Sequence, residues 1–266
     1  NLSSSERGAS SAQWQDYRET PLASVLARLN RVDHHAPRLR YHASDLAGPA
    51  SLEVAFPTVF SSYGSGELNR QIREFGEAFR QLFAGREGVS RDWSDFDRLV
   101  NHLMGVLYRF AWCLPSNTQE AVPDVSLFDH LRTTAAIASC LYQYHSATGT
   151  LDEASLRSRD VSRFCLVVGD ISGIQSYIFD IASAGAGGGV ARRLRARSLF
   201  VQLCAEIAVH MVLRRLGLPI VLHTVMNSGG RFYLLLPNLP EVTQALAETQ
   251  QAADEWFLQE LKGELA

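Results

Sequence analysis

Residues 164–175, with the sequence FCLVVGDISGIQ, determine the fold of the second half of the chain. Their first five side chains form an uninterrupted apolar run, which is typical of a central strand buried on both faces. Asp170 follows the end of this run, and Ser172 and Gly173 then predict a tight turn into a helix. We therefore expect a strand, a corner and a helix, with a carboxylate placed at the corner.

The segments after this corner alternate between helical and extended patterns. A short helix is expected over residues 174–181, a Gly/Ala-rich loop over 183–189, a long helix over 190–216, strands over 220–226 and 231–237, and a last helix over 241–261. The tetrapeptide Asn-Ser-Gly-Gly at 227–230 is a strong signal for a hairpin turn between the two strands. This order gives five of the six elements of a ferredoxin-like β-α-β-β-α-β domain, with the last strand missing.

The first 160 residues predict a mostly helical architecture instead. Apolar side chains recur at helical spacing over residues 67–84, 94–110 (with Ser94 as the cap) and 126–145. The third of these helices is apolar on both sides, so we expect it to be buried on most of its circumference. Residues 146–159 are polar and are interpreted as a linker. We therefore expect an α+β chain with a helical scaffold, residues 1–160, and a ferredoxin-like domain, residues 161–266.

Composition narrows the classes of function. Hydrophobic residues make up 46% of the chain, charged residues 20%, and the net charge is −3, which fits a soluble cytoplasmic protein and gives no global polycation. No uninterrupted apolar run approaches the roughly 20 residues that span a bilayer, so we expect no membrane contact. No P-loop or nucleophile-elbow motif is present. The isolated cysteines, in apolar stretches, predict free buried thiols rather than a zinc site or disulfides: Cys113, Cys140, Cys165 and Cys204.

The corner at Asp170 and the hairpin turn are the first candidate sites. A carboxylate beside the backbone N–H groups of a Ser-Gly turn can hold a metal, and the amides can hold a phosphate. The alternative is that Asp170 only caps the turn and that Gly173 only supplies a backbone angle. In a ferredoxin-like domain the hairpin, with Ser228, Gly229 and Gly230, lies next to the end of the first strand. The two segments should therefore converge on one surface.

An arginine cluster at the start of the long helix is the second candidate. Four arginines follow the Gly-rich loop: Arg192, Arg193, Arg195 and Arg197. Guanidinium groups suit bidentate recognition of phosphate, and cations at a helix N-terminus oppose the helix dipole unless an anion is bound. A solvated helix end is the alternative. Both chain ends are expected to be cut from something longer, because the sequence starts without Met and stops without a closing signal.

Three segments resemble the first Palm domain in the large subunit of type III CRISPR effector complexes, Csm subtype. They are GDISGIQSYIF at 169–179, RRLRARS at 192–198 and NSGGRFY at 227–233. The likeness extends upstream to DVSLFDH at 124–130 and TTAAIA at 133–138, and LSSSER at 2–7 resembles the tail of the family's HD domain. The resemblance therefore spans nearly the whole chain, in order.

The resemblance implies a larger machine. Proteins of that family carry an HD nuclease for single-stranded DNA, two Palm domains, a zinc-binding insert and a helical C-terminal domain. Their Palm pair converts ATP into cyclic oligoadenylate, with Mg or Mn, once target RNA is bound. This sequence has no HD motif, no Gly-Gly-Asp-Asp motif and no zinc cysteines, so we expect no catalytic residue in it and zinc only in the absent insert.

What the resemblance implies for this chain is an ATP-binding half-site. Its residues are Asp170, Ser172, Gly173, Ser228, Gly229 and Gly230, with Asp170 also a candidate metal ligand. The arginine cluster would contact triphosphate or nucleic acid. Implied partners are the other effector subunits, guide RNA and target RNA. Two alternatives stay open: a GGDEF-like cyclase of another family, although Arg231 stands where a second metal carboxylate would be, and a non-catalytic interaction scaffold.

Overall fold

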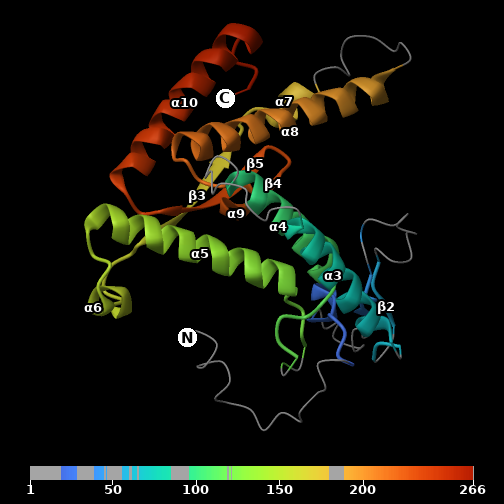
Figure 1. Cartoon of the computed structure of the whole chain (residues 1–266). Helices are drawn as coiled ribbons and strands as arrows, with labels where there is room; N and C mark the ends of the chain where they lie inside the picture. The colour runs from blue at the N-terminus through green and yellow to red at the C-terminus, as the bar shows by residue number, and fades with distance from the viewer. Residues whose placement is uncertain are drawn as a thin grey trace. The chain divides into compact units, whose positions relative to one another are not determined.

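The computed structural model describes residues 19–28, 39–44, 46, 56–59, 62–64, 66–84, 96–118, 120, 122–179 and 189–265. The chain divides into two compact units, Asn1–Arg132 and Thr133–Ala266, whose elements are drawn in Figure 1. Helix α5 (Leu127–Thr148) contributes to both. The division into domains at about residue 160 stays a prediction.

The first unit is built mainly from α3 (Glu67–Phe83) and α4 (Phe96–Ala111). Both helices were predicted, whereas the proposed cap Ser94 lies outside the described residues. A 3-10 turn, η1 (Val25–Arg28), and two short antiparallel strands, β1 (Leu39–Arg40) and β2 (Thr58–Val59), complete the unit. Ser126 caps the start of α5, because its Oγ accepts a hydrogen bond from the Asp129 N–H at 3.0 Å.

Helix α3 is fixed by two polar side chains that serve the backbone of its neighbours. The Glu67 carboxylate accepts hydrogen bonds from the N–H groups of Ala43 and Gly64, both at 2.9 Å. Gln71, which is buried, donates to the carbonyls of Ser44 and Phe110 at 2.8 and 2.9 Å. These contacts satisfy loop and helix-end groups that burial would otherwise leave unpaired.

The expectation that α5 is buried on most of its circumference is wrong for the described residues. One stripe is buried, at Phe128, Ala136 and Cys140, while Tyr142 on the other side is 62% exposed. An apolar pattern on both sides of a helix indicates that both sides can be buried. It does not show that the residues that bury them belong to the same chain. The linker after α5 also contains a short helix, α6 (Glu153–Arg157), capped by Asp152.

The second unit contains a three-stranded antiparallel sheet in the order β3-β5-β4. Its strands are β3 (Phe164–Asp170), β4 (Thr224–Ser228) and β5 (Arg231–Pro237). The predicted pairing of the first strand with 231–237 is confirmed, from Phe164 opposite Pro237 to Asp170 opposite Arg231.

Strand β3 is nevertheless not the central strand that its apolar run predicted. It lies at one edge of the sheet, and its exposure alternates, with Leu166 57% and Val168 53% exposed. The buried central strand is β5. The continuous apolar run is suited to burial on both faces, but the described residues cover β3 on one face and along one edge.

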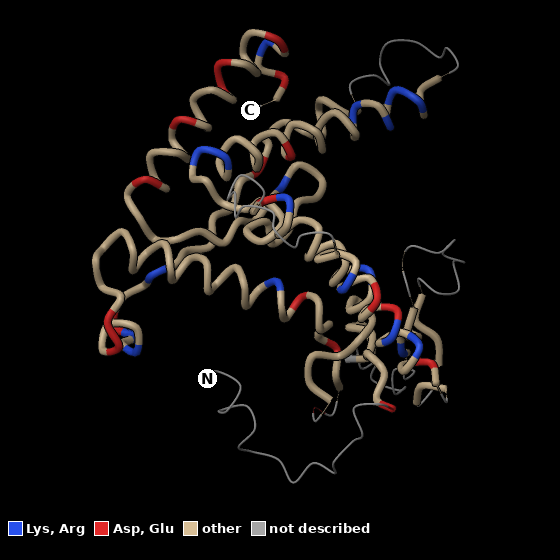
Figure 2. The backbone as a smooth tube through the Cα atoms, viewed as in Figure 1, with Lys and Arg blue, Asp and Glu red and all other residues tan. Residues whose placement is uncertain are grey.

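Two helices cover the inner face of this sheet, α8 (Val190–Arg215) and α10 (Pro240–Leu261) (Figure 1). The core joins α8, β5 and α10 through apolar side chains that include Val201, Ala205, Val209, Val212, Leu213, Phe232, Leu234, Leu236, Val242 and Phe257. By length and hydropathy α8 is able to cross a membrane. Its buried stripe in this core is instead typical of the central helix of a globular unit. Figure 2 shows basic residues on its first turns.

The predicted strand at 220–226 begins with a helical turn, α9 (Ile220–His223), before β4 starts. The carbonyl of Pro219 accepts hydrogen bonds from the N–H groups of Leu222 and His223, which explains the turn. This turn buries His223 completely. Its Nδ1 donates to the Leu235 carbonyl at 2.7 Å and its Nε2 accepts from the Ser139 hydroxyl at 3.0 Å, so the imidazole fastens α5 to the outer face of the sheet.

The four cysteines are free thiols, as predicted, but the expected burial is wrong for Cys165 and Cys204, which are only partly buried. Cys113 and Cys140 are fully buried, and burial raises the pKa of Cys113 to about 11 and that of Cys140 to about 12. Both therefore stay protonated at neutral pH and serve as core side chains.

Candidate functional site

The corner after β3 and the hairpin between β4 and β5 lie side by side, as predicted. The Ile171 N–H donates a hydrogen bond to the Gly230 carbonyl at 2.9 Å. Ile174, at the start of α7 (Ile174–Phe179), also approaches Gly230 so closely that an added Cβ would lie 2.5 Å from its Cδ1. The corner and the turn therefore form one end of the sheet.

The hairpin turn requires both of its glycines, for different reasons. Gly229 and Gly230 have φ angles of 66° and 90°, as a two-residue hairpin turn of this type demands. A side chain at Gly229 would meet open space, whereas one at Gly230 would collide with Ile174 and Val201. The Gly229 N–H is already used, because it donates to Gln202 Oε1 at 2.8 Å.

Asp170 is paired with an arginine across the sheet. The Arg231 Nε and Nη2 donate to the two carboxylate oxygens, both at 3.0 Å. These hydrogen bonds lower the pKa of Asp170 and raise that of Arg231. Among the described residues no group of three or more His, Cys, Asp or Glu side chains is arranged to hold a metal ion. The donor set around Asp170 therefore does not fit a resident metal.

Gly173 has a structural role in the corner. Its φ is 80°, and an added Cβ would lie 2.5 Å from the carbonyl oxygen of Glu264, just after α10. Only glycine permits both the backbone angle and this approach. Ser172, next to it, is exposed. The Ser172 hydroxyl is therefore accessible from solvent.

The arginine cluster at the start of α8 separates into two kinds of residue. Arg197 donates to the Tyr177 carbonyl, and its guanidinium lies 4.7 Å from the centre of the Tyr177 ring. It therefore fastens α7 to α8. Arg192, Arg193 and Arg195 are exposed and form no ion pair with other described residues. Within the cluster, these three guanidinium groups remain available to an anion.

Comparison with known proteins identifies the family. Residues 163–266 match the family model described as Csm1 subunit domain B. A Mycobacterium tuberculosis protein, the CRISPR system single-strand-specific deoxyribonuclease Cas10/Csm1 of subtype III-A, is 35% identical over 228 residues, which cover 76% of this chain and 28% of that relative. The chain belongs to the Cas10/Csm1 family.

Solved structures of Csm1 proteins share the fold. A Csm1–Csm4 cassette in complex with cA4 has a TM-score of 0.68 and 26% identity, over 96% of this chain and 30% of that one. A cassette in complex with one ATP has a TM-score of 0.64 and 29% identity, over 93% and 29% of the two chains. This Cas10/Csm1 chain thus spans less than a third of the length of these relatives.

Sequence reasoning missed two side chains that hold the hairpin of this Cas10/Csm1 chain. Besides accepting from Gly229, Gln202 donates to Asn227 Oδ1 at 3.4 Å. Glu206 accepts from Asn227 Nδ2 at 2.6 Å. Polar residues four positions apart in the middle of an apolar helix are a usable signal, because they lie on one face. That signal predicts a shared polar partner for the two side chains.

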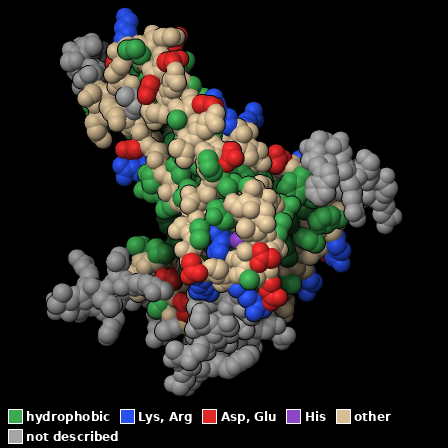
Figure 3. All heavy atoms as spheres, turned by 90° about the vertical axis from the view of Figure 1, so that its left-hand side faces the viewer, with side chains coloured by type: hydrophobic (Ala, Val, Ile, Leu, Met, Phe, Trp, Pro, Cys, Tyr) green, Lys and Arg blue, Asp and Glu red, His purple; other side chains and the backbone are tan. Residues whose placement is uncertain are grey.

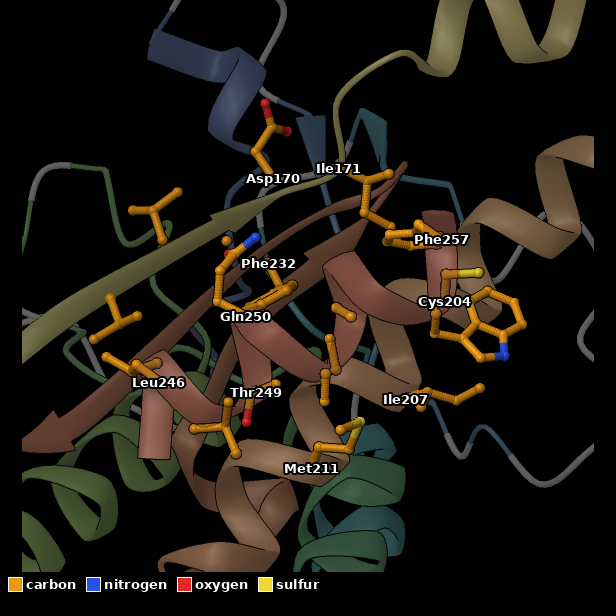
Figure 4. Close-up of a pocket in the computed structure, with 18 of the residues that line it drawn as sticks. Asp170, Ile171, Cys204, Ile207, Met211, Phe232, Leu246, Thr249, Gln250 and Phe257 are labelled. Atoms are coloured by element: carbon orange, nitrogen blue, oxygen red, sulfur yellow. The ribbon is translucent and has the colours of Figure 1, made fainter. Parts of the chain in front are cut away.

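Sequence reasoning also missed an apolar cavity of about 820 Å³ on the inner side of β3 (Figure 4). Side chains of α8 and α10, among them Ile207, Met211 and Leu246, line it. The Thr249 hydroxyl is buried there and has no hydrogen-bond partner among the described residues. Figure 4 shows the Asp170 carboxylate pointing away from this cavity, so the cavity and the corner are separate features of the Cas10/Csm1 chain.

Proposed function

We propose that this chain is part of the large subunit of a type III-A CRISPR effector complex and carries an ATP-binding half-site for cyclic oligoadenylate synthesis. The observation that carries the proposal is the junction of the corner with the hairpin, through the bond from Ile171 to Gly230. A related Csm1–Csm4 cassette, 29% identical, is known in complex with one ATP. The proposed half-site consists of Ser172, Ser228 and the turn glycines, beside Asp170 and Gly173.

The ferredoxin-like Palm arrangement belongs to this proposal. The strand order β3-β5-β4 supports it, and the outer edge of β3 has no strand partner among the described residues. The residues after α10 reach Gly173, because the Glu264 carbonyl lies against it. A strand that continued from there would start at the Asp170 end of β3 and run antiparallel along its edge. Such a strand would complete the domain.

The half-site is expected to bind and orient rather than to catalyse. The Ser228 hydroxyl is exposed and can donate to a phosphate oxygen, and the open space at Gly229 lets a phosphate approach the backbone. Mg or Mn is expected to arrive with the nucleotide, and any Asp170–metal contact would require the carboxylate to leave Arg231. In our proposal the reaction is completed by a second Palm domain with a Gly-Gly-Asp-Asp motif. DNA cleavage belongs to an HD domain.

The remaining parts of the proposal concern location and partners. The free guanidinium groups of Arg192, Arg193 and Arg195 are proposed to contact triphosphate or nucleic acid. Csm4 and the other effector subunits, guide RNA and target RNA are the proposed partners in the cytoplasm. Residues 1–160, predicted to be mostly helical, are the proposed scaffold. Relatives of this chain have been solved as Csm1–Csm4 cassettes and as a Csm1–Csm4 subcomplex of the type III-A CRISPR-Csm interference complex.

Substitutions in the hairpin test the half-site in the full effector complex. Ser228→Ala removes one hydrogen bond to a charged group, which should weaken ATP binding about tenfold. Gly229→Val should block the approach of a phosphate. The matched control is Gly149→Val, because Gly149 also has a left-handed φ, of 67°, and open space around it. Both hairpin variants should keep guide and target RNA binding.

The outcomes of this experiment separate the alternatives. If both hairpin variants assemble and bind ATP like the parent complex, the half-site is wrong and the interaction scaffold is favoured. The family match already disfavours a GGDEF-like cyclase of another family. The purified chain alone is expected neither to degrade single-stranded DNA nor to make oligoadenylate. If a clean sample of the chain formed a metal-dependent product, this would contradict the proposal that catalysis belongs to other domains.

A further inference from the structure

The outer face of the sheet, which faces away from α8 and α10, ends in two rows of cross-strand neighbours. The polar row joins Asp170, Arg231 and Ser228, because Arg231 is opposite Asp170 on β3 and opposite Ser228 on β4. The apolar row, next to it, joins Val168, Tyr233 and Met226 in the same way. Side chains two residues apart on a strand share a face, so both rows are exposed on one surface beside the hairpin.

Most of the other charged or donor groups of the candidate site are used by the fold. The Gly229 N–H bonds to Gln202, and Arg197 bonds to Tyr177. Arg195 precedes Gln202 by seven residues, which is about 10 Å along a helix. The free arginines of α8 therefore stand away from the turn that Gln202 holds.

Arg231, the first residue of β5, is a cation directly beside the turn. Its guanidinium gives Nε and Nη2 to Asp170 and is 52% exposed. A guanidinium has five N–H donors in a rigid fork. Asp170 accepts two of them and the Tyr233 side chain also bonds to the guanidinium, so the donors that remain point in a fixed direction. The Asp170 carboxylate, by contrast, repels phosphate. A phosphate at this end of the sheet would therefore bind to Arg231 rather than to Asp170.

We propose that Arg231 binds the phosphate groups of the nucleotide in this half-site and that Asp170 is a positioning residue that orients the guanidinium. The inference rests on the proposed function and names the cation that the half-site otherwise lacks. The adjacent row of Val168, Tyr233 and Met226 offers an apolar and aromatic surface for the nucleoside. Arginine suits this role because its planar fork matches two phosphate oxygens at once.

The test compares ligands with and without phosphates on the full effector complex. Arg231→Met should weaken ATP binding about tenfold and leave adenosine binding unchanged. Arg231→Lys should recover part of the loss for ATP, because it restores the charge but not the fork. Arg215→Met is the matched control: Arg215 is partly exposed and pairs with Glu248 at 3.5 Å on the same unit, and its loss should change neither affinity.

Asp170→Asn separates orientation from charge. It removes a negative charge, which favours phosphate, but it also weakens the hold on the guanidinium. If Asp170 positions Arg231, Asp170→Asn should weaken ATP binding, although less than Arg231→Met. Tighter ATP binding by Asp170→Asn would show that Asp170 acts through its charge alone and would overturn the positioning role.

The remaining outcomes each decide the inference. If Arg231→Met binds ATP normally while Ser228→Ala binds it weakly, the role of Arg231 is wrong and the half-site stands. If none of these changes affects ATP, both proposals fail. An equal loss for ATP and adenosine would mean that Arg231 only shapes the hairpin, which contradicts phosphate binding. A loss confined to a short single-stranded RNA would assign the guanidinium to RNA and also overturn the proposal.

Discussion

The two faces of the β3-β5-β4 sheet differ in what covers them. The inner face meets α8 and α10, and there Leu234 and Leu236 are fully buried. The outer face meets α5 at Leu235, while its end beside the hairpin leaves Asp170 and Arg231 about half exposed. Because neighbouring residues on a strand point to opposite faces, each strand contributes to stability on one side and to a ligand surface on the other. Figure 3 shows hydrophobic side chains that remain on the surface in one view.

The largest expected effect tests whether the inner face carries the stability. Leu234→Ala should lower the free energy of unfolding by about 2–5 kcal/mol, because it opens a cavity in a closed core. Leu166→Ala, on the outer face and 57% exposed, should cost less than about 1 kcal/mol. Urea-induced unfolding of the two variants measures both values. Equal losses would remove the distinction between the faces.

The two turn glycines sharpen the same comparison at the end of the sheet. Gly230→Ala should destabilise by about 2–4 kcal/mol, because it combines a left-handed backbone with contacts to Ile174 and Val201 on the inner side. Gly229→Ala should cost about 1 kcal/mol, because it carries the backbone strain alone. Thermal unfolding distinguishes them. If Gly229→Ala were the more harmful change, the contacts seen at Gly230 would not limit stability.

His223 makes the outer face sensitive to pH where α5 covers it. Burial lowers the pKa of His223 below its ordinary value of 6.5, so the folded chain resists protonation that the unfolded chain accepts. The contribution to stability is therefore complete above pH 6.5 and is lost as the pH falls toward the lowered pKa. The free energy of unfolding, measured from pH 7.5 to 5, should fall more steeply for the parent than for His223→Gln. Parallel curves would contradict this.

The smallest expected effect concerns the link between α8 and the hairpin. Gln202→Ala removes the acceptor of the Gly229 N–H, which should cost about 0.5–1.5 kcal/mol because the exposed N–H can bond to water instead. Amide hydrogen exchange at Gly229 should speed up more than exchange at Leu234. Unchanged exchange at Gly229 would show that the hydrogen bond does not hold the turn.

The sequence predicted most of the local structure. The helices at α3, α4, α8 and α10 and the hairpin at Gly229 were predictable, because apolar spacing and turn glycines act over short distances. The missed features have two origins. The helical turn of α9 is local, because the Pro219 carbonyl directly precedes it, but the apolar run over 220–226 favoured a strand. The exposure of one face of β3 depends on which elements pack against the sheet, and no local pattern specifies them.

The candidate site was predictable in place but not in detail. The order of the strands and helices along the chain was enough to predict that the corner after β3 and the hairpin turn lie side by side. No local sequence pattern predicted that Arg231 pairs with Asp170, because the two residues are 61 positions apart and are brought together only by the register of β3 and β5. The sequence shows that Gln202 and Glu206 share a helix face, but it does not show that this face meets the hairpin. Their role is set by which helix face meets the hairpin, and tertiary packing determines that.

Helix α8 has a mechanical consequence for this end of the molecule. It is one element of 26 residues, about 39 Å long, with three free arginines on its opening turns and the grip on the hairpin near its middle. A stiff rod that is pulled at one end turns about its most tightly packed point, here the buried stretch from Val201 to Val212. Because Gln202 and Glu206, which hold the hairpin, lie within that stretch, a force on the arginines would move the opening turns of α8 and leave the hairpin in place.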